Sequence, residues 1–261
     1  MPLNQFCKDI ISPVSGVPLS AEKLEQFSAL YDRVLEVNSV MNITSLTDMC
    51  DVALKHFADS LTLVPVISGI GGKSIIDIGC GGGFPGLPLK IALPDYSVTM
   101  LDSTEKKVRS VEQTAGLLGL SEMHFVAGRA EELAKKDSPM RERYDFAVSR
   151  AVARLNVLCE LCLPFVRKGG YFLAMKGAGA DDELKEARSA VFALGGKVER
   201  VIKQSPDCDE ILSSVSAASE QELERLRDFC GAGRSIIAVR KVSTTGGKYP
   251  RAFAAITKKP L

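Results

Sequence analysis

Hydrophobic residues recur at helical spacing in two segments near the start of the chain. The first follows Ser20, a favoured helix N-cap, and its apolar positions 24, 27, 30, 31, 34 and 35 share one face. The second follows Asp48 and stops at Pro65, and a polar stretch at 39–48 separates the two. These segments predict a small helical cap over residues 1–70.

From Lys73 onward the pattern changes to short apolar runs that alternate with amphipathic stretches. The pattern predicts strands at 74–78, 97–102, 123–126, 144–148 and 171–175, and helices at 85–92, 104–118, 129–136 and 155–166. Two later strands, near 197–202 and 235–239, flank an acidic helix at 219–229. The fold class is therefore α/β, with a doubly wound, mostly parallel, Rossmann-like seven-stranded sheet in a domain over residues 71–261.

The composition indicates the size of the protein and the compartment in which we expect it. The 261 residues are 46% hydrophobic, and no apolar run reaches the roughly 18 residues that span a bilayer. The N-terminus lacks the pattern of a secretory signal, and seven scattered cysteines predict free thiols in a reducing compartment. We therefore expect a cytoplasmic protein with no membrane segment. The close pair Cys159 and Cys162 lies on an apolar helical face, which favours core packing and no bound metal.

A glycine-rich loop joins the first predicted strand to the helix that follows it. Asp77 and the glycines at 79, 81 and 83 fit the methyltransferase pattern of an acid followed by Gly-x-Gly-x-Gly. A nicotinamide fingerprint read from Gly79 fails, because Phe84 stands at its sixth position. A frame from Gly81 to Gly86 matches, but it lies two residues further from the strand. Glycines here let a ligand approach the backbone amides closely.

Asp102 ends the second predicted strand, where its carboxylate can accept hydrogen bonds from both hydroxyls of an unphosphorylated ribose. S-adenosylmethionine and a dinucleotide both carry such a ribose. The glycine pattern together with Asp102 favours S-adenosylmethionine. A dinucleotide enzyme and a loop that merely turns tightly remain the alternatives.

Further candidate site residues follow the other strands. Ala130 and Glu131 come after the third strand, beside the expected adenine, although acidic residues also suit the start of a helix. Arg150 and Lys176 end the fourth and fifth strands, near the topological switch at which open parallel sheets bind ligands. In isolation, an arginine in this place is more often a surface residue.

Several motifs together resemble the RsmG (GidB) family of 16S ribosomal RNA guanine-N7 methyltransferases. They cover residues 38–177 densely and the two ends more thinly. The most specific are the glycine loop continued by GFPG at 83–86 and the segment HFADSL at 56–61. The others are NITS at 42–45, LDS at 101–103, KKVR at 106–109, GRAEE at 128–132, SRAVA at 149–153, MKG at 175–177 and KYPR at 248–251. Two departures stand out, Cys80 in place of the usual threonine and a longer, more acidic stretch at 204–233.

The resemblance implies a class I, S-adenosylmethionine-dependent enzyme that methylates N7 of a guanine, number 527 in the family's 16S rRNA. It implies 16S rRNA or a small-subunit particle as partner, and we expect a monomer. It places cofactor contacts at Gly79, Phe84, Asp102, Ser103, Ala130, Glu131 and Arg150. Arg150 and Lys176 are the catalytic candidates, as groups that orient the guanine.

The chemistry of N7 sets the expected mechanism. N7 has a free in-plane lone pair, so no general base is needed, and alignment and electrostatics carry catalysis. For His56 the bonded alternative, a contact with Asp59 or the Asn42 loop, is favoured over a role in orienting the cofactor. His124 is expected in the core or at a sheet edge. Phosphate contacts are proposed for residues 106–109 and for the basic tail 240–261, with a solvated surface as the alternative for both.

Rival functions are a small-molecule methyltransferase, an NAD-dependent reductase and a non-catalytic protein that senses S-adenosylmethionine or binds RNA. The basic tail modestly favours RNA over a metabolite as substrate.

Overall fold

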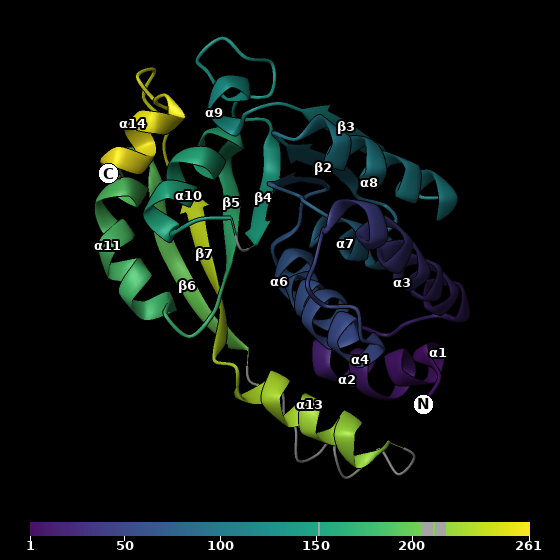
Figure 1. Ribbon diagram of the computed structural model, residues 1–261. Coiled ribbons are helices and arrows are strands. Elements are labelled where there is room, and N and C mark those ends of the chain that lie inside the picture. Colours follow the sequence, from purple (N-terminus) through teal and green to yellow (C-terminus); the bar gives the residue numbers. More distant parts are fainter. Residues whose placement is uncertain (151, 205–210, 212–217) are drawn as a thin grey trace.

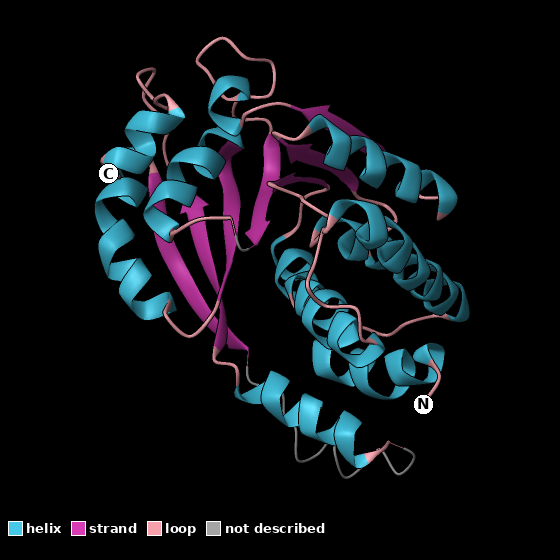
Figure 2. Cartoon of the chain, viewed as in Figure 1, coloured by secondary structure: helices cyan, strands magenta, loops and turns pink. Residues whose placement is uncertain are grey.

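A computed structural model describes residues 1–150, 152–204, 211 and 218–261. The structure contains one seven-stranded sheet. It lies between two groups of helices (Figures 1 and 2). The strands are β1 (Ser74–Ile78), β2 (Ser97–Asp102), β3 (Met123–Ala127), β4 (Tyr144–Arg150), β5 (Val166–Lys176), β6 (Gly196–Gln204) and β7 (Arg234–Lys241). The helices of the sheet domain are α7 (Gly86–Ala92), α8 (Glu105–Leu117), α9 (Ala130–Leu133), α10 (Leu155–Cys162), the 3₁₀ turn η3 (Leu163–Phe165), α11 (Ala180–Ala193), α13 (Glu220–Gly231) and α14 (Phe253–Lys258).

The strand order is β3-β2-β1-β4-β5-β7-β6. Strands β1 to β5 are parallel, and β7 is antiparallel to both β5 and β6. The predicted doubly wound, mostly parallel sheet of seven strands is therefore confirmed. The order reverses between β1 and β4, so the carboxyl ends of these two strands flank the crevice in which such sheets bind ligands.

Alternate residues of the strands enter two separate cores, one on each face of the sheet. Ile75 and Val148 pack with the N-terminal helices, α7 and α8, whereas Ile76 and Ala147 pack with α10 and α11. Burial on both faces explains why these strands are almost continuously apolar.

The N-terminal part is helical as predicted, and it contains more helix than the periodicity indicated. Ser20 caps α3 (Ala21–Met41), and Asp48 caps α4 (Met49–Val52) through two backbone amides. A π-helical turn η2 (Ala53–Ala58), α5 (Asp59–Leu61) and α6 (Leu63–Ile70) follow. The first residues form α1 (Leu3–Phe6), a π-helical turn η1 (Cys7–Ile11) and α2 (Ser12–Ser15), which the sequence pattern had not indicated. Helix α11 is a second element that was missed.

Some predicted bounds were wrong for local reasons. The helix expected at 129–136 ends at Leu133 in α9, and the one at 155–166 ends at Cys162, where a 3₁₀ turn with Pro164 leads into β5. Strand β5 is longer than expected because it begins at Val166, which pairs with Tyr144 before the register between β4 and β5 shifts. Much of the acidic stretch 204–233 lies outside the described residues.

Free thiols are confirmed for the five cysteines at 7, 50, 80, 159 and 162, all of them buried. Cys159 and Cys162 are fully enclosed in the core, as predicted. The prediction is wrong for Cys230, which is disulfide-bonded. Cys208 lies outside the described residues. No helix in the described part of the chain is long and apolar enough to cross a membrane.

The basic tail is only partly a basic surface. Lys241 is 0% exposed and donates hydrogen bonds to the carbonyl of Leu163 and to Thr245 Oγ1. Burial lowers the pKa of Lys241 to about 8. Arg251 forms a bidentate ion pair with Glu160, in which Nε donates to Oε1 and Nη2 to Oε2, and Glu160 is itself fully buried. These two cations hold the C-terminal segment in place, so the structure supports neither a phosphate contact nor a solvated side chain at these two positions.

Candidate functional site

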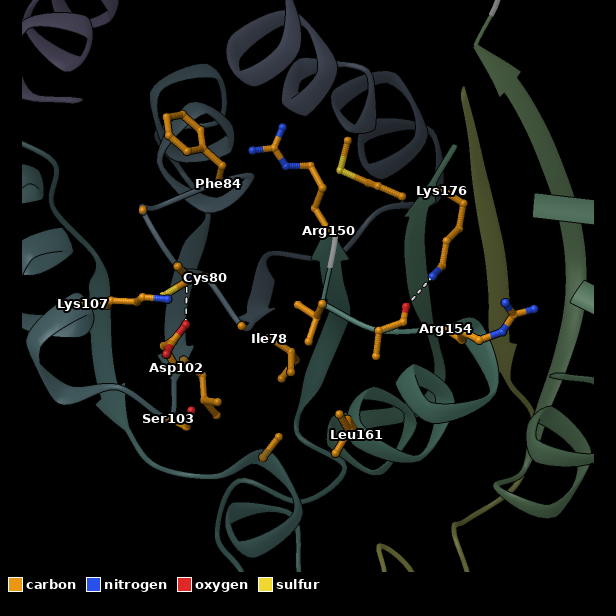
Figure 3. Close-up of a pocket in the computed structure, with 18 of the residues that line it drawn as sticks. Ile78, Cys80, Phe84, Asp102, Ser103, Lys107, Arg150, Arg154, Leu161 and Lys176 are labelled. Carbon is orange, nitrogen blue, oxygen red and sulfur yellow. Dashed lines mark hydrogen bonds between the residues drawn. The ribbon is translucent and has the colours of Figure 1, made fainter. Parts of the chain in front are cut away.

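A cavity of about 1100 Å³ lies at the carboxyl ends of the parallel strands. All the predicted site residues line it: Gly79, Phe84, Asp102, Ser103, Ala130, Glu131, Arg150 and Lys176. They come from the ends of five different strands and from the turns that follow, and Figure 3 shows how several of them converge. The fold therefore gathers residues that are nearly 100 positions apart in the chain.

The glycine loop forms the floor beside β1. Gly79 has φ +76°, and the amides of Gly79 and Cys80 both donate to the carbonyl of Leu101. A Cβ on Gly79 would come within 2.6 Å of Val152 Cγ2. The loop can follow this path only because glycine tolerates the left-handed region without a Cβ clash.

Asp77 anchors the other end of the loop and does not line the cavity. It is fully buried, and its Oδ2 accepts a 2.8 Å hydrogen bond from the Gly86 amide at the start of α7. Burial raises its pKa to about 7, although the Gly86 hydrogen bond acts in the opposite direction. The acid of the motif therefore stabilises the turn rather than contacting the ligand.

Asp102 has the geometry expected for a ribose-binding carboxylate. It is 8% exposed, and its oxygens accept hydrogen bonds from Gly81 N at 3.0 Å and Thr104 N at 2.8 Å. Figure 3 shows the first of these bonds crossing from the glycine loop. Each carboxylate oxygen has two lone pairs, so one on each remains for a hydroxyl. The carboxylate is thus oriented by the backbone and still able to accept two more hydrogen bonds.

The wall next to Asp102 is largely apolar. Ile78, Leu101, Ala130 and Leu161 line it, and the chain enters α9 there with Glu131 buried. An apolar slot beside a carboxylate suits an adenosine, because the purine faces need apolar contact and the ribose needs acceptors. The residues present therefore fit S-adenosylmethionine.

Arg150, at the end of β4, is held by three groups of the N-terminal helices. Its Nη1 donates to the carbonyl of Lys55 at 2.6 Å and to Asp59 Oδ2 at 3.3 Å, and its Nη2 lies 3.0 Å from His56 Nδ1. The guanidinium also lies 5.4 Å from the centre of the Phe84 ring. The side chain is therefore fixed in direction and, at 16% exposed, still reaches the cavity.

His56 both lines the cavity and bonds to the loop after α3. Its Nε2 lies 2.9 Å from Thr44 Oγ1, and its ring stacks on Phe84 with 4.6 Å between centroids. The favoured interpretation, a histidine hydrogen-bonded to the Asn42 loop, is confirmed. The charged residue that His56 contacts is Arg150, not Asp59. The other histidine, His124, is exposed on the edge strand β3. A sheet edge was one of its two predicted positions.

Lys176 is more constrained than the sequence indicated. Its ammonium donates to the carbonyl of Ala153 at 2.6 Å, shown in Figure 3, and pairs with Glu183 Oε2 at 2.8 Å. The side chain is 8% exposed. Its charge is therefore balanced within the protein, and its hydrogen bond fixes the turn after β4.

Asp59 and Arg234 are among the lining residues that were not predicted as site residues. Asp59 was considered only as a neighbour or partner of His56, and Arg234, at the start of β7, was not considered. Because β7 is antiparallel to β5, its first residue lies beside the last residues of β5, where Ser235 pairs with Lys176. Nothing in the sequence gives the direction of β7, so no local signal could have placed Arg234 in the cavity.

Of the predicted phosphate-binding residues, only Lys107 lines the cavity. Lys106 and Arg109 are exposed on α8, and Arg109 pairs with Glu105. Phe253, from the C-terminal segment, reaches the rim and lies over the guanidinium of Arg129 at 5.7 Å.

Comparison with known proteins gives a consistent result. Residues 23–212 match the sequence model of the family described as GidB, rRNA small subunit methyltransferase G. A ribosomal RNA small subunit methyltransferase G from Lachnoclostridium phytofermentans is 40% identical over 247 residues, which cover 94% of this chain and 93% of the relative. Another, from Clostridium kluyveri, is 35% identical and covers 99% and 97%. A solved structure described as a sarcosine dimethylglycine methyltransferase from Galdieria sulphuraria covers 82% and 99% with a TM-score of 0.51 at 13% identity, which shows a shared fold alone.

Proposed function

Because the chain belongs to the rRNA small subunit methyltransferase G family, we propose that it transfers a methyl group from S-adenosylmethionine to N7 of a guanine in 16S ribosomal RNA. The family supports the cofactor, the methyl transfer and the small-subunit rRNA substrate. Such a substrate sets the reaction in the cytoplasm.

One observation carries the choice of N7. At the substrate end of the cavity, the described side chains that could take a proton are already engaged. Asp59 pairs with Arg150 and Arg234, Glu183 pairs with Lys176, and His56 bonds to Arg150. Methylation of an amine or a hydroxyl requires removal of a proton, whereas N7 attacks with a free lone pair. A site whose acceptors are occupied in this way suits N7.

The residues of the chain then have distinct tasks. When bound, S-adenosylmethionine supplies a methyl group on a positively charged sulfur. Asp102 holds the ribose, the glycine loop lets the ligand approach the backbone, and Ala130 with Leu161 contacts the adenine. We place Arg150 at O6 of the guanine or at a flanking phosphate, out of line with N7, because a cation in line would oppose the charge that develops there. Lys176 acts indirectly as a positioning residue, through the turn at Ala153.

The test uses small ribosomal subunits from cells that lack the enzyme. The full-length protein is incubated with these subunits or their RNA and with methyl-labelled S-adenosylmethionine, and the label is mapped to a nucleotide and an atom. Label at N7 of one guanine in 16S rRNA is the expected result. Label at another atom would overturn the choice of N7, and label on metabolites but not on RNA would favour a small-molecule enzyme.

A further inference from the structure

Asp59 joins two arginines that come from different strands. Its Oδ2 pairs with Arg150 Nη1 at 3.3 Å, and its Oδ1 pairs with Arg234 Nη1 at 3.0 Å. The three side chains are between 13% and 16% exposed, and all three line the cavity. One carboxylate cannot balance two guanidinium groups, so the cluster carries an excess positive charge in a partly desolvated place.

The excess positive charge of this cluster is located on Arg234. Nη1 is used by Asp59, whereas Nε and Nη2 are buried and have no hydrogen-bond partner. These two nitrogens form one edge of the guanidinium, the edge that grips a phosphate or carboxylate with two parallel hydrogen bonds. The plane of the group is held in turn by the Phe229 ring, whose centre lies 3.3 Å from Arg234 Cζ. An oriented, unsatisfied donor pair of this kind costs stability unless an anion completes it.

Among the described residues, the rest of the cavity does not supply that anion. The described basic side chains that line it outnumber the acidic ones: Lys107, Arg129, Arg150, Arg154, Lys176 and Arg234 against Asp59, Asp102, Glu131 and Glu183. Of these acids, Glu183 is paired with Lys176 and Asp59 is already shared. Within the described part of the chain, the completing anion is therefore left to a ligand.

The position of Arg234 indicates whether the anion belongs to the RNA or to the cofactor. The ribose-binding Asp102 ends β2, and the strand order places β1, β4 and β5 between β2 and β7. Four inter-strand steps correspond to about 19 Å. A cofactor whose ribose is held at β2 extends toward β1 and β4, so an anion at the start of β7 lies on the substrate side.

We propose that the Nε–Nη2 edge of Arg234 binds a backbone phosphate of the substrate RNA next to the target nucleotide, with Asp59 coupling this contact to Arg150. The inference rests on the proposed function, because it takes RNA as the substrate. Binding of the phosphate would hold the backbone while the base enters the cavity beside Arg150. Enzymes that act on a base within folded RNA need such a hold, because the base must leave its stack.

The experiment compares the wild type with Arg234→Met, which keeps an apolar stem over Phe229, and with Arg234→Lys, which keeps a charge but lacks the two-pronged edge. Methyl transfer to unmethylated small subunits gives KM and kcat, and filter binding of 16S RNA at several salt concentrations gives the salt slope. Calorimetry with S-adenosylhomocysteine gives cofactor affinity. Arg227→Met, an exposed position on α13, is the matched control.

For Arg234→Met we expect KM for the RNA substrate to rise at least tenfold, with kcat within threefold of the wild type and cofactor affinity unchanged. The slope of log K against log salt should fall by about 0.7, the value for one contact to single-stranded RNA. Arg234→Lys should keep the slope and recover part of KM. Arg227→Met should behave as wild type.

Other outcomes overturn the inference. An unchanged KM and slope would show that Arg234 contacts no phosphate, and a loss confined to kcat or thermal stability would show a structural role. A matching loss of S-adenosylhomocysteine affinity would assign the edge to the carboxylate of the cofactor. If the wild type bound RNA but did not methylate it, the proposed function would fail while the slope comparison still decided the role of Arg234. A wild type that did not bind RNA would remove both.

Discussion

Arg150 Nη2 lies 3.0 Å from His56 Nδ1, and this contact determines the protonation state of the histidine. A guanidinium can only donate, so Nδ1 must be the acceptor and the ring is neutral with its proton on Nε2, directed at Thr44 Oγ1. The neutral ring in turn holds Arg150 beside Phe84. Burial, and then the charge of Arg150, lower the pKa of His56 to about 4.

The first prediction concerns pH. The pKa of His56 is lower in the folded state than in the unfolded state. As pH falls below about 6.5, the unfolded chain therefore binds a proton at this histidine that the folded protein does not bind. The free energy of unfolding then decreases progressively down to about pH 4. Between pH 7.5 and 5.0 the wild type should lose about 2 kcal/mol more of its free energy of unfolding than His56→Gln. Urea unfolding at both pH values measures this. His124→Gln, an exposed change on β3, should retain the wild-type pH dependence, and equal losses in wild type and His56→Gln would refute the assignment.

Arg150→Ala should reduce methyl transfer at saturating substrates at least tenfold, which is about 1.4 kcal/mol of activation free energy. The fold should survive, because Asp59 keeps its ion pair with Arg234. Arg188→Ala, an exposed change on α11, is the control for loss of an arginine. A full rate in Arg150→Ala would exclude the residue from the mechanism.

Asp102→Ala should weaken S-adenosylhomocysteine binding about a hundredfold or more, because two hydrogen bonds to a charged acceptor are each worth about 1.5–3 kcal/mol. Calorimetry measures the affinity, and circular dichroism shows whether the variant protein remains folded. Asp95→Ala removes a carboxylate that is 85% exposed and should leave binding unchanged. Wild-type affinity in a folded Asp102→Ala protein would contradict the ribose assignment.

Gly86→Ala should destabilise the protein by about 1–3 kcal/mol, the range for overpacking a closed site. The added Cβ would lie 2.3 Å from Met100 Sδ and 2.9 Å from Asp77 Oδ2. Gly116→Ala, on α8, has no atom within 4 Å of the added carbon and should instead gain about 0.5–1 kcal/mol through helix propensity. Chemical unfolding compares the two, and the prediction fails if both substitutions shift stability in the same direction.

Arg251→Ala should cost about 3–5 kcal/mol, because it leaves the buried carboxylate of Glu160 without its partner. In a Glu160→Gln background the same substitution should cost much less, since no buried charge is then left unpaired. Arg227→Ala breaks an exposed pair with Glu220 and should cost no more than about 1 kcal/mol. Equal costs for Arg251→Ala in both backgrounds would show that packing, not charge, is responsible.

Much of the fold and of the cofactor half of the site could be predicted from the chain alone. Strands β1 and β2 were placed to the residue, because fully buried strands of a parallel sheet are short apolar runs bounded by polar turns. The glycine loop and Asp102 follow directly from those strand ends. Placing Arg150 and Lys176 in one cavity needed only the rule that parallel strands end at the same edge.

Local pattern was not enough where a side chain acts through a distant partner. Residues 1–15 and α11 were missed because short or polar helices have little periodicity, and their stability comes from packing against the sheet. Lys241 and Arg251 resembled a solvated basic tail, since their partners at Leu163 and Glu160 are far away in sequence.

The sequence by itself determined the parallel sheet, the glycine turn, the carboxylate at the end of β2 and the arginine at the end of β4, because each depends on residues within one strand and its following turn. Only the tertiary structure decided that β7 runs antiparallel and brings Arg234 to Asp59, and that His56 holds Arg150 as a neutral ring. The physical reason is that charge balance and hydrogen-bond roles depend on which groups are in contact. The direction of each strand in the sheet determines those contacts.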